Sequence, residues 1–347
     1  MLKKILVLLL TMCTLVAFSQ EPHAVKHLRD STPNIAKMDE WLTVKLSQST
    51  DVEKLAVITP TTEIRLSPNA ASVTRLGVSY RFLSASYSYI PRFIPGNNDD
   101  AEKGKTKGGS FSAGISLPHW MQELSYSRVK GYYLENTSDF NPDWTPGKPY
   151  IQFPDLVFTQ FEGMTAYKFN ADFSANAILT QSERQLKSAG SFVPRLLYRY
   201  YINNDKSTPT PGGFTQKGKN LELLIGAGYY YNFIIRERFY AALGLAPGAG
   251  YIFSWITTRA GDGTTAYGSQ QNFIFRLDGL VSIGYNGPRL FAGAYTRIIE
   301  SAFRQERSQV ITEDDRVMFQ VVLGYRFKAP RLLKAGVDKL ESKMPKL

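Results

Sequence analysis

The sequence contains a single cysteine, Cys13, in 347 residues. Cys13 lies in an N-terminal segment that has the pattern of a secretory signal peptide. Lys3 and Lys4 precede the apolar stretch Ile5–Phe18, and small residues come before a cleavage site near Gln20. We therefore expect the protein to be exported from the cytoplasm.

Cleavage of the predicted signal peptide, residues 1–19, leaves a mature chain without cysteine. Such a chain has no disulfide framework and no thiol chemistry. A lipoprotein signal ending at Cys13 is a less favoured alternative, because Met12 is larger than the residue that usually precedes a lipidated cysteine.

Long hydrophobic runs are also missing. After the signal segment, no stretch has the ~18 consecutive apolar residues that a membrane-spanning helix needs. An exported chain of this kind is either soluble or a β-barrel of the outer membrane. Mean hydropathy is −0.22, which does not argue against a barrel, because alternating strands average to a neutral value.

Histidine is scarce, which limits enzymatic chemistry. Of the three histidines, His119 lies in a Pro-His-Trp turn and is interpreted as a membrane-boundary anchor. His23 and His27 lack the Glu of a His-Glu-x-x-His metal motif, and no Gly-x-Ser-x-Gly motif occurs. We expect no enzymatic activity, no catalytic residue and no cofactor; a lipid hydrolase that uses His119 is the weakest alternative.

Metal binding by acidic loops is also disfavoured. The acidic groups within Asn97–Glu102 and Glu313–Asp315 lack the spacing of a calcium-binding loop. They are interpreted as exposed loop charges, and no metal site is predicted.

The chain has a net charge of +11 but no dense block of Lys and Arg. Nucleic-acid binding is therefore not expected. Positive charge that faces a lumen or an anionic lipid surface is the favoured interpretation. The 20 Tyr and 21 Phe are consistent with aromatic belts at two water–lipid boundaries.

Period-two alternation is the dominant pattern, and it is clearest in Arg316–Phe327. Its odd-numbered positions from Val317 onward are apolar or aromatic, whereas the positions between them are small or polar and end at Arg326. Similar segments recur and are joined alternately by tight turns and long polar loops. This asymmetry predicts an all-β fold: a transmembrane antiparallel β-barrel of about 12 strands, with 10–14 as the range. A soluble β-sandwich is the alternative.

The predicted barrel covers residues 41–328, after a periplasmic N-terminal segment at 20–40. Tight turns are predicted at Arg81-Phe82, Pro118-His119, Arg236-Glu237 and Asn286-Gly287-Pro288. Long loops are predicted at Pro91–Lys107, Glu135–Pro154, Asn203–Asn220, Arg259–Gln270 and Glu300–Asp315.

The alternation of turns and loops is lost between Asn170 and Asn220. A hairpin around Asn170 is predicted there, joining Val157–Phe169 to Ala171–Leu179. Either a further strand is missed after it, or the segment Gln181–Phe192 folds into the lumen.

The alternation also predicts which charged side chains point into the lumen. These are Glu162, Lys168, Asp172, Arg195, Arg199, Glu222, Arg276, Asp278 and Arg326. Such a mixed set can fill a narrow barrel by ion pairing or can line a channel. A filled lumen is favoured, because open aqueous pores are typical of wider barrels.

The basic C-terminal tail, residues 329–347, follows the last predicted strand. Leu333, Val337, Leu340 and Met344 share one helix face. The tail could lie on the inner surface of the membrane that holds the barrel, or it could bind a periplasmic or envelope protein partner. The alternative is a solvated chain end.

Two stretches carry a family resemblance: Lys107–Asn136 and Phe173–Phe192, in which Glu183-Arg184-Gln185 and Ser188-Ala189-Gly190-Ser191 are distinctive. They resemble an uncharacterised family of Bacteroidota proteins, domain of unknown function 4421. The likeness extends from about Trp41 to Lys328. It implies an outer-membrane β-barrel and brings no activity, substrate or catalytic residue.

The expected molecule is thus an outer-membrane β-barrel in contact with outer-membrane lipid. Its expected role is structural, or passive transport of a small solute or lipid. The alternative is an accessory subunit of an envelope or secretion complex.

Overall fold

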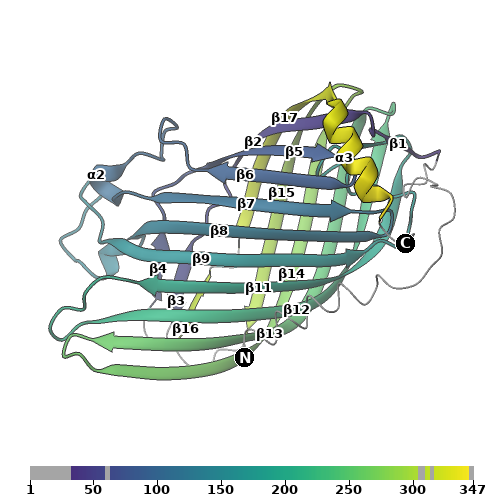
Figure 1. The fold of residues 1–347 in the computed structure, drawn as a ribbon. Coiled ribbons are helices and arrows are strands. Elements are labelled where there is room, and N and C mark those ends of the chain that lie inside the picture. The colour runs from purple at the N-terminus through teal and green to yellow at the C-terminus, as the bar shows by residue number, and fades with distance from the viewer. Residues whose placement is uncertain (1–32, 59–62, 304–308, 313–315, 344–347) are drawn as a thin grey trace.

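The computed structural model describes residues 33–58, 63–303, 309–312 and 316–343. Within these residues twelve antiparallel strands close into a barrel, which confirms the predicted fold class. The strands are β2 (Trp41–Ser49), β5 (Val73–Tyr80), β6 (Leu83–Tyr89), β7 (Lys107–Ser116), β8 (Trp120–Leu134), β9 (Gln152–Tyr167), β11 (Ala189–Asp205), β12 (Phe214–Ile235), β13 (Phe239–Ala260), β14 (Thr265–Asn286), β15 (Leu290–Phe303) and β17 (Arg316–Lys328). Each pairs with its neighbour in this order, and β17 pairs with β2 to close the ring (Figure 1).

The outer surface of the barrel is apolar. On β17, side chains at alternate positions, from Val317 to Phe327, are exposed, whereas Val322 and Arg326 between them are buried. On β12 the outward face is apolar from Leu221 to Ile235. Period-two alternation therefore separates an apolar outside from a largely polar inside. No helix in the described ranges has the length and apolarity needed to cross a membrane.

Tight turns occupy one end of the barrel, hereafter the turn end. All four predicted turns are confirmed at the β5–β6, β7–β8, β12–β13 and β14–β15 connections. Arg81, Arg236 and Glu237 adopt φ values of 52°, 51° and 57°. Two consecutive positive φ values are typical of the type I′ turn, whose twist matches that of the flanking strands.

Long connections lie at the opposite end, the loop end, but two of them are shorter than predicted. The loop predicted at Arg259–Gln270 is wrong, because β13 runs to Ala260 and β14 begins at Thr265. Asp262 Oδ1 accepts hydrogen bonds from the backbone N (2.9 Å) and Oγ1 (2.7 Å) of Thr264, which tighten the connection. These bonds lower the pKa of Asp262 below its ordinary value. Likewise, only residues 206–213 separate β11 from β12.

Three short strands extend the sheet at the loop end: β3 (Leu55–Ile58), β4 (Glu63–Ser67) and β16 (Gln309–Thr312). β4 pairs with the end of β8, where the β8–β9 register shifts at Gly131. Gly131 has a φ of 91°, and a Cβ there would lie 2.2 Å from the carbonyl oxygen of Lys105, so only glycine fits. The short helix α2 (Asp100–Lys103) and the 3-10 turn η1 (Thr137–Asp139) also lie in loop-end connections.

The hairpin predicted around Asn170 is wrong. β9 ends at Tyr167, and residues 168–188 form an irregular insert that contains only one short strand, β10 (Glu183–Gln185). β10 pairs with β1 (Ile35–Lys37), which lies before the barrel. We call residues 168–188 the plug. In its first half, apolar and polar residues alternate as they do in a strand, but the segment does not pair with the barrel sheet. The plug therefore explains why the alternation of tight turns and long loops is lost after Asn170.

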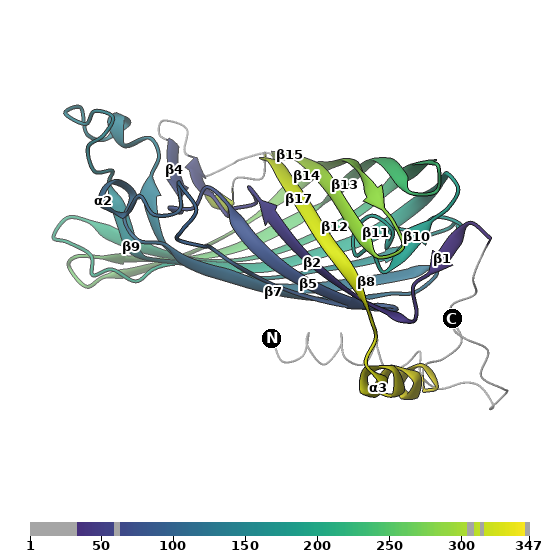
Figure 2. The same cartoon turned by 90° about the horizontal axis from the view of Figure 1, so that it is seen from above.

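The C-terminal tail folds into helix α3 (Arg331–Glu341) at the turn end (Figure 2). Val337 is buried against Tyr80, Phe82 and Leu117, and Leu333 packs at the edge of this cluster. Met344 lies outside the described residues. The face predicted for the tail is therefore used, in part, to dock on the barrel itself.

Arg81 fixes the orientation of α3. Its guanidinium donates to Asp338 (2.6 Å) and Glu341 (2.8 Å). Burial disfavours the charged form, but the hydrogen bond to Asp338 and the charge of Glu341 outweigh it and raise the pKa of Arg81. The docked helix is thus anchored by both apolar packing and ion pairs.

Candidate functional site: an occluded charged lumen

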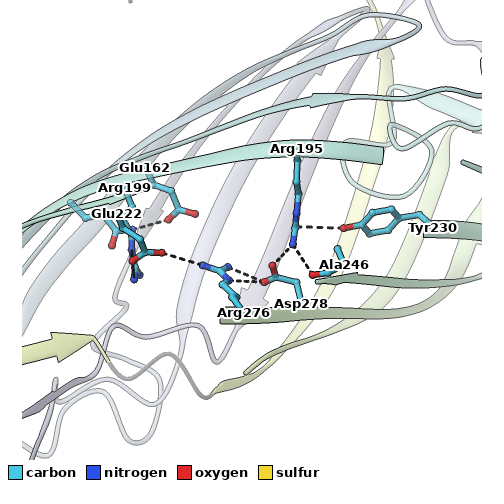
Figure 3. Close-up of polar contacts among 9 residues, drawn as sticks. Glu162, Arg195, Arg199, Glu222, Tyr230, Ala246, Arg276 and Asp278 are labelled. Carbon is cyan, nitrogen blue, oxygen red and sulfur yellow. Dashed lines mark hydrogen bonds and ion pairs between the residues drawn. The ribbon is translucent and has the colours of Figure 1, made fainter. Parts of the chain in front are cut away.

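Charged side chains of alternating sign form a row on the lumen side of three neighbouring strands, β9, β11 and β12 (Figure 3). The strand registers place Arg199 beside Glu162 on one side and Glu222 on the other. The guanidinium of Arg199 donates to Glu222 at 2.5 and 3.0 Å, and both side chains are almost fully buried. Such a charge-assisted pair is strong only because both partners are present in a poorly solvated interior.

The row continues along β14. Arg276 lies 3.8 Å from Glu222 and donates to Asp278 at 2.9 and 3.0 Å. Asp278 also accepts a hydrogen bond from Arg195 on β11. The row therefore links β11, β12 and β14 by polar contacts across the lumen side of the sheet (Figure 3).

Small residues on the inner wall leave room for these side chains. Arg195 donates to the Tyr230 hydroxyl (3.5 Å) and to the carbonyl oxygen of Ala246 (3.2 Å). A Cβ at Gly244 would lie 2.2 Å from the Tyr230 ring. The absent side chain is what allows Tyr230 to lie flat beside Arg195.

Cavities persist beside the row. The larger has a volume of about 350 Å³ and is lined by residues of opposite walls, such as Arg75 of β5 and Arg195 of β11, and also by Asp278 and Arg297. A smaller one of about 140 Å³ lies near β2, β5 and β15, and it shares Arg75 and Arg297 with the first. The lumen is thus a chamber with polar walls.

The plug closes the chamber at the turn end, and Arg326 holds it there. Arg326 is fully buried and donates to the carbonyl oxygen of Gln181 (2.6 and 3.0 Å), to Asn286 Oδ1 (2.6 Å) and to the carbonyl oxygen of Gly287. Gln181 in turn donates to the Tyr295 hydroxyl on β15. A charge with no aqueous access is retained here because several oxygens surround it.

Further polar contacts tie the plug to the wall and to β1. Asn232 on β12 donates to the carbonyl oxygen of Ser174 (3.0 Å) and to Gln185 Oε1 (3.0 Å). Glu183 accepts from Ser174 Oγ (2.5 Å) and pairs with Lys37 of β1 (2.7 Å). The turn end is therefore sealed by a hydrogen-bonded network.

An apolar cluster closes the loop end. Leu55 of β3 and Leu66 of β4 pack against inward side chains of the barrel wall. These wall residues are Tyr132, Leu134, Leu156, Phe158, Tyr201, Leu224, Ile252 and Ile274. We call the β3–β4 hairpin and this cluster the cap. The two ends of the chamber are thus closed by different chemistry.

One ion pair anchors the cap from outside. Burial opposes ionisation of Glu135, but hydrogen bonds from Lys54 (2.9 Å) and Ser67 (2.7 Å) outweigh it and lower the pKa of Glu135. The carboxylate therefore stays charged and fixes the hairpin beside β8.

The predicted lumen residues fall into two groups. Glu162, Arg195, Arg199, Glu222, Arg276, Asp278 and Arg326 lie on barrel strands and take part in the contacts above or line the chamber. Lys168 and Asp172 lie instead in the plug, so their placement on a strand is wrong. The backbone N of Lys168 donates to the carbonyl oxygen of His119 (2.6 Å).

Several lumen residues were not predicted. Lys45, Arg75, Glu123 and Arg297 line the chamber, and Tyr230 contacts Arg195. The same period-two alternation that located Arg199 could have found them, since each lies between two outward residues of its strand.

The residues weighed for catalysis or metal binding have structural contacts. His119 stacks on Tyr167 with ring centroids 5.5 Å apart, and its Nδ1 lies 2.7 Å from the carbonyl oxygen of Lys168. In the described ranges no three His, Cys, Asp or Glu side chains are grouped as metal ligands would be. His23, His27 and Glu313–Asp315 lie outside the described residues.

The acids of Asn97–Glu102 make loop contacts. Asp99 pairs with Lys103 (2.8 Å) and Asp100 pairs with Arg92. The Asn97 side chain accepts from the backbone N of Ala71 (2.7 Å). These groups hold the β6–β7 loop in place.

Solved structures with related architecture are outer-membrane proteins. OmpT of Vibrio cholerae is 10% identical over 82% of this chain and 99% of its own, with a TM-score of 0.28. The toluene transporter TodX of P. putida is 7% identical over 86% of this chain and 91% of its own, with a TM-score of 0.26. A major outer membrane protein of Thermus thermophilus is 10% identical over 82% and 99%, with a TM-score of 0.23.

Sequence comparison gives a clearer result. No curated protein matches the chain. Residues 30–327, which include all of the barrel except its last residue, match the family described as "Domain of unknown function (DUF4421)". The chain belongs to this family.

Proposed function

We propose that the protein is a non-catalytic barrel of the outer membrane that admits small polar solutes to its lumen when the plug moves. The observation that carries the proposal is a chamber inside the barrel, lined by charged and polar side chains among apolar ones, within a wall whose outside is apolar. Structural support of the membrane alone would not require a polar chamber with fixed charges.

The apolar exterior supports insertion in a bilayer. In water such a surface would favour association, whereas hydrocarbon covers it at no such cost. On β12 the outward face changes from Leu221 to the basic Lys219 and Lys217 toward the loop end. Trp255, which pairs with Lys219 on β13, is half exposed at the same level. An aromatic side chain followed by lysines is typical of a membrane boundary.

The plug and the cap favour a gated passage rather than a permanently open pore. Plug and cap leave a chamber of about 350 Å³ rather than a continuous channel. The plug is held by hydrogen bonds, which exchange readily with water once the segment moves, and by the packing of Ile178 against wall residues such as Tyr240 and Phe291. We therefore place the gate at the plug.

Planar-bilayer recordings test this function. The variants replace residues 171–187 of the plug, residues 53–67 of the cap, or both, with Gly/Ser linkers of equal length. The control replaces residues 206–213, an ordinary loop-end connection, in the same way. We expect low conductance from the unaltered protein and the control, and a stable rise when both closures are removed. A doubly altered barrel that still passes no ions would contradict the proposal and leave a structural role.

The accessory-subunit alternative has a narrower basis. α3 uses Val337 and Leu333 to dock on the barrel, so a protein partner would have to bind its outer face, where Leu332 is 89% exposed. Crosslinking with and without residues 329–347 tests this alternative.

A further inference from the structure

Two arginines of the lumen wall have no acidic partner in the part of the chain that the structure describes. Arg75 on β5 and Arg297 on β15 line both cavities. Among the described residues, neither guanidinium makes a hydrogen bond or an ion pair. The arginines of the opposite wall differ, since Arg195 pairs with Asp278 and Arg199 with Glu222. Arg75 and Arg297 therefore keep their donors available to the chamber.

A third cation lies between them. The strand order β5-β2-β17-β15 places Lys45 on a strand between those of Arg75 and Arg297, and Lys45 lies opposite Gly77, two residues from Arg75. Lys45 donates to the carbonyl oxygen of Leu179 in the plug, and it interacts electrostatically with Arg75, Glu123 and Arg297. The four charges thus belong to one region of the lumen, next to the plug.

The charges of this region do not balance. Lys45, Arg75 and Arg297 stand against two acids, Asp51 and Glu123, in the lining of the smaller cavity. One positive charge is left over in this lining, and the side chain of Arg297 is exposed. A singly charged anion would neutralise the excess.

The rest of the lining can donate hydrogen bonds to an anion. Serine hydroxyls surround the smaller cavity, at Ser49, Ser79, Ser84, Ser86, Ser112 and Ser116. Guanidinium groups match the geometry of carboxylate and phosphate oxygens, and hydroxyls add further donors. An apolar solute would find no comparable set of hydrogen-bond partners here.

We propose that the lumen holds a binding site for a small oxyanion, a carboxylate or a phosphate, between Arg75 and Arg297. The cavities of about 140 and 350 Å³ have room for an anion of a few heavy atoms together with water. The proposed site identifies small oxyanions as the solutes of the proposed function. Binding at the site does not depend on that function; only passage of the anion through the barrel does. Because Lys45 contacts both the plug and this region, a bound anion also acts on a group that holds the plug.

Calorimetric titration of the full-length mature barrel in detergent micelles tests the site. Inorganic phosphate and succinate are the probes, and glycerol is the neutral control. Each sample is also incubated with the probe to equilibrium, and binding is read by equilibrium dialysis beside calorimetry, so that slow plug opening does not limit access. Binding of phosphate alone assigns a phosphate site, binding of succinate alone assigns a carboxylate site, and both results support the proposal.

The variants are expected to change the affinity for the anion in opposite directions. Arg75→Gln and Arg297→Gln each weaken binding by at least about tenfold, the usual scale for losing a charged donor. Glu123→Gln strengthens it, because it removes a like charge from beside the anion. Arg128→Gln, an outward arginine of β8, leaves it unchanged. Arg75→Lys keeps the charge without the planar fork and gives an intermediate loss, which covers the case of a poorly folding glutamine variant.

Two results would overturn the site: neither probe binds the unaltered barrel, or the arginine variants bind as tightly as the parent. The outcome is independent of the conductance test. Anion binding by a barrel that never conducts contradicts the proposed passage and leaves the site standing. Conductance without anion binding contradicts the site and leaves the passage standing.

Discussion

Arg326 illustrates how one buried charge can hold a segment in place. Its guanidinium is surrounded by oxygens of Gln181, Asn286 and Gly287, two of which are backbone carbonyls. It also packs over the Phe291 ring, 5.0 Å from its centroid. These contacts join β17 to the plug and to the β14–β15 turn, so the residue links three parts of the chain.

Arg326→Gln is expected to loosen the plug. The substitution removes several charge-assisted hydrogen bonds and leaves buried carbonyls without donors, a loss of about 2–4 kcal/mol. When samples are heated to increasing temperatures before electrophoresis, the temperature at which the folded band disappears should fall. Hydrogen exchange in residues 168–188 should accelerate. Lys328→Gln, an exposed position two residues later, is the control and should change neither. Unchanged exchange in the plug would contradict this role of Arg326.

The Arg199–Glu222 pair gives a second residue-scale prediction. Glu222→Gln leaves Arg199 buried beside an uncharged partner and should destabilise the barrel by about 3–5 kcal/mol. Arg199→Gln in the same chain should restore part of the loss, because the buried guanidinium that had lost Glu222 is then absent. Denaturant titration of both single variants and the double variant measures the coupling. Additive losses would mean that the two side chains act independently.

At the scale of elements, period-two alternation predicted most barrel strands and all four tight turns. It failed in residues 171–179, where alternate apolar residues such as Phe173 and Ala177 pack inside the plug rather than on a strand. Alternation reports that two faces differ, but it does not report whether the backbone pairs with a neighbour. Only the register of β9 with β11 shows that the plug is left out of the sheet.

The lumen site was predictable only where the strand assignment was correct. Arg199, Glu222 and Asp278 followed from alternation, whereas Asp172 was misplaced together with its strand and Lys168 lies just beyond the end of β9. Which charges pair across the lumen depends on strand register, as in the placement of Arg199 beside Glu222. A single sequence does not specify register across twelve strands, so the pairs and the unpaired arginines emerged from the structure.

Helix α3 gives a prediction at the same scale. Val337→Asp places a charge in the apolar contact with Tyr80 and Phe82, and Arg81→Gln removes the ion pairs to Asp338 and Glu341. Either change should release the helix while the barrel stays folded. Limited proteolysis should then remove the tail from both variants faster than from the parent. Leu332→Asp, at an exposed position of the helix, should be cleaved at the parental rate. Equal cleavage of all forms would contradict docking.

At the scale of the whole molecule, the fold is an apolar cylinder around a polar chamber. A hydrogen-bonded plug closes one end and an apolar cap closes the other. The outside suits hydrocarbon and the inside suits water and small polar solutes. The paired charges of β11–β14 line one wall, whereas the guanidinium groups of Arg75 on β5 and Arg297 on β15 have no hydrogen bond or ion pair among the described residues.

Membrane fractionation followed by electrophoresis of unheated and boiled samples tests the central claim most directly. A closed barrel in the outer membrane should be recovered in that fraction, and its migration should shift between the two samples, because the barrel stays folded in detergent until it is boiled. Recovery as a soluble protein without a shift would contradict the account, and every inward and outward assignment along the strands would then have to be replaced.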